Sequence, residues 1–307
     1  MKKIFLLTLA LSMMAAAAWA HVPDDRTFLA FQWPDGAVPT IDGNLAEWAV
    51  VPEVYVVNNE DTHMAYPPDG PTEVNKADLD FRGYIGYNDA SDKAIFATQV
   101  FDDEHERDNT DPGQCNCADD NFEFWIDGDH AGSPYVAEYG TADGASAEER
   151  ERATNSTLQW WSIAVPPVGD RDVQSGNTGQ WQDDSPHFDF AWSFEGVQFG
   201  ESTYYYEMSF TVWDDLDHNG PDTSTPSTLD EGETIGINLI WSDFDGSKAW
   251  NVNDDGSTGY DAYWITGGPC CDGVNASDFL LAPLESGLFT DTAVETDTWG
   301  RLKARFE

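Results

Sequence analysis

Short segments in which hydrophobic and polar residues alternate dominate this chain. In the segment NFEFWID (121–127), the alternation places Phe122 and Phe124 on one face of an extended strand and Glu123 and Trp125 on the other. A period of two residues is typical of a β-strand whose two faces meet different surroundings. The same pattern predicts strands over 84–87, 94–101, 159–165, 188–194, 206–213 and 234–241.

The segments between these strands are rich in Asp, Asn, Gly and Pro, which favour turns through side-chain capping and positive φ. Only residues 145–154 have a helical pattern, inside a polar insertion. We therefore predict an all-β fold, an immunoglobulin-like or jelly-roll antiparallel β-sandwich with long acidic loops. No Pro/Gly/Ser-rich linker divides residues 21–307, which we interpret as one domain.

The first 20 residues have the pattern of a secretory signal. Lys2 and Lys3 precede an apolar run that ends in Ala18-Trp19-Ala20, a small-x-small cleavage pattern. The run is too short to span a bilayer, which needs roughly 20 apolar residues, so we expect no membrane insertion. The sequence predicts a mature chain that begins at His21 and is secreted, periplasmic or held at the cell surface.

Charge limits the classes of partner. The chain has 14 Lys and Arg residues against 57 Asp and Glu residues, a formal net charge of −43. Nucleic acid is excluded as a partner, since binding phosphates requires a basic surface. Anionic lipid surfaces are disfavoured for the same reason. Adaptation to salt and colloidal solubility both explain such acidity, and so does calcium binding by some of the clusters.

Four cysteines form the pairs Cys115/Cys117 and Cys270/Cys271. An even number of cysteines in an exported protein indicates disulfides. Because adjacent cysteines rarely pair with each other, we expect two bridges between the two loops. Zinc held by four thiolates is the alternative, although its usual spacing is CxxC.

Two acidic segments are candidate metal sites. Asp119 and Asp120 enter the strand 121–127, while Asp127 and Asp129 lie at its other end. At roughly 3.3 Å per residue, an extended strand keeps the two pairs about 20 Å apart, so they cannot form one catalytic dyad. Calcium prefers scattered carboxylate and carbonyl oxygens, and solvated turn acids are the other interpretation.

The second acidic segment is DLDHNGPD (215–222), whose first six residues fit the calcium-loop pattern D-x-[DN]-x-[DN]-G. Pro226 stands where an EF-hand has its glutamate, and a strand precedes the loop, so this is not an EF-hand. The candidate ligands here are Asp215, Asp217, Asn219 and Asp222.

Thirteen tryptophans exceed what one core usually needs. Sugars stack their CH faces on aromatic rings and direct their hydroxyls to polar side chains, so a tryptophan beside acids or amides is a candidate sugar contact. Core packing is the alternative for each of them. The candidate ligand-binding residues are Glu123, Trp125, Trp181, Trp250, Asn253 and Trp264.

A series of motifs in a fixed order carries a family resemblance. PTIDGNLAEWAVVP opens the series at 39–52, and LDFRGYIGYNDASDKAIFATQVFDDEH, ADDNFEFWIDGD, YYYEMSFTVWDDL, IGINLIWSDFDGS and TDTWGRLKARF follow. In this order they resemble the family 9 carbohydrate-binding modules, a β-sandwich group. The chain departs from the pattern at Val212 and by long insertions. The resemblance implies a non-catalytic protein that binds a polysaccharide or glycan and holds structural calcium.

Two other functions stay open. The first is a surface or matrix structural protein that uses the sandwich for assembly. The second is a copper-dependent polysaccharide oxidase, in which the amine and imidazole of a mature N-terminal His21 would bind copper together with a second histidine. Enzymes of other classes are not indicated, because the chain has no G-x-S-x-G motif and no carboxylate pair stands out.

Overall fold

A computed structural model describes residues 26–67, 70–107, 116, 119–132, 158–168, 171–175, 180–217, 219–245, 261–268 and 273–289. The strands are β1 (Thr27–Gln32), β2 (Val56–Asn58), β3 (His63–Tyr66), β4 (Leu79–Asn88), β5 (Lys93–Asp102), β6 (Asn121–Asp127), β7 (Gln159–Val168), β8 (Arg171–Ser175), β9 (Phe188–Gly196), β10 (Ser202–Thr211), β11 (Trp213–Asp215), β12 (Thr225–Pro226), β13 (Thr234–Asp243), β14 (Ala262–Ile265) and β15 (Ser277–Leu281). The helical elements are the 3-10 turns η1 (Leu45–Val50), η2 (Glu53–Tyr55), η3 (Asn59–Asp61), η4 (Asp89–Ser91), η7 (Gln180–Asp183), η8 (Pro221–Thr223) and η9 (Gly273–Asn275), and the short helix α3 (Ser286–Phe289).

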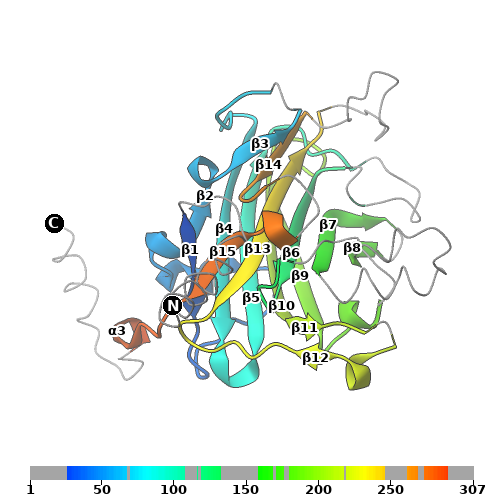
Figure 1. Cartoon of the computed structure of the whole chain (residues 1–307). Helices are drawn as coiled ribbons and strands as arrows, with labels where there is room; N and C mark the ends of the chain where they lie inside the picture. Colours follow the sequence, from blue (N-terminus) through cyan, green and yellow to red (C-terminus); the bar gives the residue numbers. More distant parts are fainter. Residues whose placement is uncertain are drawn as a thin grey trace, which may run out of the picture.

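The strands form two sheets that share β1. Sheet A has the order β8-β7-β6-β13-β15-β1, with β14 paired to β13 and β3 paired to β14. Sheet B has the order β1-β4-β5-β10-β9, with β2 attached to β4. In Figure 1, β7 and β8 (green) lie on one flank and β1 and β2 (blue) on the other. The predicted all-β sandwich is confirmed, and β1 is the exception to antiparallel pairing, because it runs parallel to both β15 and β4.

The main core lies between the two sheets and is built by the alternation seen in the sequence. Phe122, Phe124 and Ile126 of β6 all lie in it, each no more than 1% exposed. Met208 and Phe210 of β10 face them from the other sheet, and both are fully buried. Removing this apolar surface from water, at about 25 cal/mol per Å², is the main force that holds the sheets together.

The predicted strands correspond to β4, β5, β6, β7, β9, β10 with β11, and β13. The strands that were not predicted are β1, β2, β3, β8, β12, β14 and β15. Each has six residues or fewer, which leaves any alternation too short to stand out. The helix predicted over 145–154 lies outside the described residues.

The opening motif of the family resemblance covers the outer face of sheet B. Glu207 of β10 accepts hydrogen bonds from the backbone N–H groups of Asp42 (2.9 Å) and Gly43 (3.1 Å), and from Nε1 of Trp48 (2.8 Å). Gly43 has a φ of 78°, and a Cβ there would lie 2.7 Å from the backbone of Trp192. The IDG and EW parts of the motif are thus fixed by one buried carboxylate of a distant strand.

Candidate functional site

Acidic side chains from several segments meet at one end of the sandwich. Asp102 is the last residue of β5, Asp120 immediately precedes β6, and Asp243 is the last residue of β13. All three are at least 96% buried. Pairing of β6 with β13 brings Asp120 and Asp243 together, and Asp102 joins them from β5 of the facing sheet. We call this group the acidic centre; it comprises Asp78, Asp102, Asp103, Asp120, Asp243, Asp245 and Asp261, together with His105.

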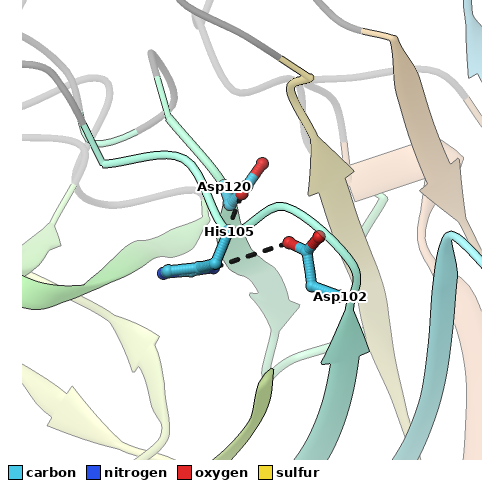
Figure 2. Close-up of side chains that lie close together, drawn as sticks. All are labelled: Asp102, His105 and Asp120. Atoms are coloured by element: carbon cyan, nitrogen blue, oxygen red, sulfur yellow. Dashed lines mark ion pairs between the residues drawn. The ribbon is translucent and has the colours of Figure 1, made fainter. Parts of the chain in front are cut away.

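The inner triad of the acidic centre consists of Asp102, His105 and Asp120 (Figure 2). Nδ1 of His105 lies 3.5 Å from Oδ2 of Asp102 and 3.5 Å from Oδ2 of Asp120. The opposite nitrogen, Nε2, lies 2.7 Å from the carbonyl oxygen of Val165. A carbonyl only accepts, so Nε2 carries a proton and donates it. The imidazole is also fixed by Tyr204, whose ring centroid is 3.9 Å away.

The backbone holds both carboxylates of the inner triad in place. Oδ1 of Asp102 accepts a hydrogen bond from the N–H of Glu104 (2.9 Å). Oδ1 of Asp120 accepts from the N–H of Phe244 (2.6 Å), and its Oδ2 accepts from the N–H of Glu106. Burial and the nearby charge of Asp102 raise the pKa of Asp120 well above its ordinary value.

The outer triad consists of Asp78, Asp243 and Asp245, which all supply oxygen. One carboxylate oxygen of each lies within 4.8 Å of the others. Burial, then the charges of Asp102 and Asp245, raise the pKa of Asp243 to about 9. Burial and the charge of Asp78 raise the pKa of Asp245 to about 6. Carboxylates packed this closely favour binding of a proton or of a cation.

Asp119, which directly precedes Asp120 in the sequence, lies in a different environment from the inner triad. Its Oδ2 forms an ion pair with Nη1 of Arg107, and both side chains are at most 2% exposed. Arg107 also donates to the carbonyl of Pro166 (3.2 Å). Asp119 therefore belongs to an ion pair, whereas Asp120 belongs to the inner triad.

Asp127 and Asp129 lie at the other end of β6, as the strand length predicts. Asp127 is 1% exposed, and its Oδ2 accepts from the N–H of Gly132 (2.7 Å). Asp129 is exposed and accepts from the N–H of Ala131 (3.1 Å). Burial and a hydrogen bond to Asp127 raise the pKa of Asp129 to about 6. Gly128 and Asp129 line a cavity of about 510 Å³ with Asp214, Thr228, Glu233, Thr234 and Ile235.

In the loop 215–222, the predicted ligands mostly face solvent or their own backbone. Asp215, Asn219 and Asp222 are exposed. Oδ1 of Asp217 accepts from the backbone N–H (2.8 Å) and from Nδ2 (2.6 Å) of Asn219. Within the described part of the chain, the two triads of the acidic centre are the groups with metal-ligand spacing, and neither includes this loop.

A second polar group lies on the outer face of sheet A. Asn121 and Glu123 of β6 are opposite Ser242 and Ile240 of β13, and Glu123 is also opposite Ser162 of β7. All five are at most 5% exposed. We call Asn121, Glu123, Ser162 and Ser242 the polar strip. Among the described residues, Oδ1 of Asn121 and Oγ of Ser242 have no hydrogen-bond partner.

Glu123 is the charged member of the polar strip. It accepts hydrogen bonds from Nε1 of Trp160 (3.1 Å) and from Oγ of Ser162 (3.4 Å). Burial nonetheless raises its pKa to about 7, because these two bonds only partly offset the loss of water. Trp125 stacks on Trp160 beside it, with centroids 5.3 Å apart and an interplanar angle of 28°. Trp160 is half-buried and stands at the border of this face.

The other predicted ligand residues are dispersed. Trp264 is 2% exposed and belongs to the core between the sheets. Trp181 in η7 is half-buried and packs edge-on against Trp213, with centroids 5.3 Å apart. Trp250 and Asn253 lie outside the described residues, as do all four predicted disulfide cysteines, Cys115, Cys117, Cys270 and Cys271, and His21, the predicted mature N-terminus.

Sequence reasoning missed Asp102, His105 and Asp243 as a site. Asp102 and Asp243 end strands, and His105 follows one. This position was the signal that the sequence offered for a site, because loops at strand ends bring functional groups together. Of the polar strip, the sequence analysis identified Glu123 but not Asn121, Ser162 or Ser242.

No helix in the described part of the chain is long and apolar enough to cross a membrane.

No protein family model matches the chain, and no curated protein matches it. Among solved structures, the chain is similar to a family 9 carbohydrate-binding module from Caldicellulosiruptor kristjanssonii in complex with cellotriose, at 11% identity and a TM-score of 0.46, over 87% of this chain and 97% of that one. It is also similar to a module of the same family and organism in complex with glucose, at 9% identity and a TM-score of 0.45, over 85% and 98% of the two chains.

Proposed function

We propose that this chain is an exported, non-catalytic protein that binds a polysaccharide or glycan on the outer face of sheet A. The observation that carries the proposal is the polar strip: Asn121 and Ser242 each present a buried oxygen without a partner, next to the carboxyl group of Glu123. Leaving such an atom unpaired costs about 1–3 kcal/mol, so a ligand that supplies the missing hydrogen bond recovers that free energy.

A sugar has the chemistry that this face lacks. Its hydroxyl groups both donate and accept, as Glu123, Asn121 Oδ1 and Ser242 Oγ require. Its CH groups stack on aromatic rings, and Trp125 and Trp160 lie parallel beside Glu123. Trp160 is half-buried and its Nε1 donates to the carboxyl group of Glu123, so we infer that a sugar hydroxyl reaches this group beside Trp160. The net charge of −43 favours an uncharged ligand over an anionic one.

Structural calcium is the second part of the proposal, and it belongs in the outer triad. Calcium binds six to eight oxygens, and Asp78, Asp243 and Asp245 offer carboxylates from three segments. The residues fit the ion, since the carboxylate of Asp243, which is 2% exposed, has other acids around it and accepts no hydrogen bond from the residues that the structure describes. A bound cation would remove their mutual repulsion and join the ends of β4 and β13.

Affinity electrophoresis and a glycan array, run with calcium present, test glycan binding directly. Wild-type protein should be retarded by at least one plant, algal or bacterial polysaccharide. Glu123→Gln, which keeps the shape but removes a charged acceptor, should weaken retention at least about tenfold, the loss of one charge-assisted hydrogen bond of about 1.5–3 kcal/mol. The matched control is Asp215→Asn, an equal change at an exposed acid. Absence of wild-type retention on every polysaccharide would contradict the proposal.

A further inference from the structure

The inner triad differs chemically from the outer triad, because it contains an imidazole nitrogen. Calcium is a hard cation that takes oxygen ligands, whereas imidazole with carboxylates suits zinc and the other divalent transition metals. His105 is 4% exposed, so its nitrogen has no access to bulk water.

We propose that Asp102, His105 and Asp120 form a zinc site that is separate from the calcium site of the outer triad. It is independent of glycan binding.

The distances within the inner triad fit coordination better than direct hydrogen bonding. Nδ1 lies 3.5 Å from one oxygen of each carboxylate, which is longer than an N–H···O bond of 2.7–3.2 Å. In a tetrahedral zinc site with bonds of about 2.0–2.2 Å, neighbouring ligand atoms are about 3.4 Å apart. Both distances from Nδ1 match the spacing of ligands around one ion, and the three ligand atoms all lie within 4.8 Å of one another, which leaves a fourth position for water.

The surroundings of His105 fix the tautomer that a metal requires. Nε2 donates to the carbonyl of Val165, which leaves the lone pair on Nδ1 directed at the two carboxylates. Histidine ligands of metals usually donate their other N–H to a carbonyl or carboxylate in this way. Contact with the ring of Tyr204, tilted by 33° at a centroid distance of 3.9 Å, restricts rotation of the imidazole. Both carboxylates are held by backbone N–H groups, so the site is rigid before any ion arrives.

His130, also in the described part of the chain, serves as a comparison for His105. Nε2 of His130 lies 3.0 Å from Oδ1 of Asp278, an ordinary hydrogen-bond distance, and both side chains are about a third exposed. That histidine lies at hydrogen-bond distance from one carboxylate, whereas His105 lies at coordination spacing from two.

Metal analysis of the mature chain tests the site. The protein is stripped with chelator, returned to saturating calcium so that the outer triad is filled, dialysed against zinc chloride, and measured by mass spectrometry for bound zinc. We expect one tightly held zinc in the wild type and in the control His130→Gln. His105→Gln should reduce zinc affinity by on the order of 100-fold or more, while its glycan retention stays unchanged. Equal zinc content in His105→Gln and the wild type would overturn the site.

Cobalt substitution gives a readout that needs no variant. Co²⁺ in the stripped wild type should give the strong visible absorption of a tetrahedral ion, and zinc should abolish it. A weak octahedral spectrum, or a spectrum that calcium displaces, would mean that the inner triad is only part of the calcium site and would overturn the proposal. Absence of any zinc or cobalt binding, with an imidazolium signal for His105 in nitrogen NMR, would show instead a buried ion pair.

Discussion

Glu123 and Glu207 are two buried glutamates on the outer faces of the two sheets, and they differ in what the chain offers them. Glu207 is fully buried and accepts three hydrogen bonds from N–H groups, two from the backbone of Asp42 and Gly43 and one from Trp48. Glu123 is 3% exposed and accepts one N–H bond and one long hydroxyl bond.

This difference indicates that Glu207 has a structural role, whereas Glu123 is a candidate for binding a ligand. Burial raises the pKa of both carboxyl groups, and hydrogen bonds from Trp48, Asp42 and Gly43 lower that of Glu207 again. The three N–H donors around Glu207 are all bonded to its carboxyl group, so none of them is left to bind a ligand. Beside Glu123, Asn121 and Ser242 retain unpaired oxygens among the described residues. Incomplete hydrogen bonding of a buried group, rather than its burial, marks the candidate ligand face.

The largest expected effect is the loss of stability in Glu207→Ala. Three N–H groups would lose their acceptor, of which those of Gly43 and Trp48 are buried. Each unsatisfied buried group costs about 1–3 kcal/mol, so we expect the free energy of unfolding to fall by about 3–5 kcal/mol. Urea unfolding monitored by tryptophan fluorescence measures the change. A loss below about 1 kcal/mol would show that the motif at 39–52 is not fixed by this carboxylate.

Glu123→Gln should have the opposite effect on stability at high pH. Because the pKa of Glu123 is raised from 4.5 to about 7, the folded state holds the proton more tightly than the unfolded state, and stability is lost as pH rises through this interval. Each pKa unit corresponds to about 1.4 kcal/mol, so the wild type should lose up to about 3 kcal/mol by pH 8. Glutamine resembles the protonated acid and should be spared this loss.

Urea unfolding of the wild type and Glu123→Gln at pH 4 and pH 8 checks this. The two proteins should be similar at pH 4, and the variant should be the more stable at pH 8. A constant difference across pH would mean that Glu123 does not titrate in this interval.

Calcium should raise the free energy of unfolding of the wild type by a moderate amount. At about 100 times its dissociation constant, an ion that binds only the folded state adds about 2.7 kcal/mol. Asp245→Asn removes one ligand of the outer triad and should reduce this response, whereas Asp222→Asn in the loop 215–222 should not. The response to calcium is measured by thermal unfolding with calcium, with chelator, and with sodium chloride at matched ionic strength. If sodium chloride reproduces the whole shift, the stabilisation is charge screening and not a site.

The smallest expected effects are at the exposed acids of the loop 215–222. Asp215→Asn and Asp222→Asn should change the free energy of unfolding by no more than about 0.5 kcal/mol, as is usual for exposed positions. Urea unfolding at saturating calcium measures this. A larger loss in either variant would favour the calcium loop that the D-x-[DN]-x-[DN]-G pattern suggests.

The sequence predicted the sandwich because alternation over seven or more residues in strands such as β6 reports directly which face is buried. It also predicted that Asp119/Asp120 and Asp127/Asp129 lie apart. It could not predict the acidic centre, since Asp78, Asp243 and Asp245 come from segments that are distant in the sequence and meet only where the two sheets pack together. Nor could it separate Glu123 from Glu207, because both lie on strands with the same alternation and differ only in distant donors.

The measurement that tests the central claim most directly is glycan affinity of the wild type, Glu123→Gln, Ser242→Ala and the control Asp215→Asn, by isothermal titration with the polysaccharide that retards the wild type. All four proteins should first be shown to be folded by circular dichroism. We expect Asp215→Asn to bind as the wild type does, and both variants of the polar strip to bind at least about tenfold more weakly, since each removes a hydrogen bond of about 1.4 kcal/mol or more to the sugar. Unchanged affinity in both Glu123→Gln and Ser242→Ala would show that the glycan binds elsewhere on the molecule.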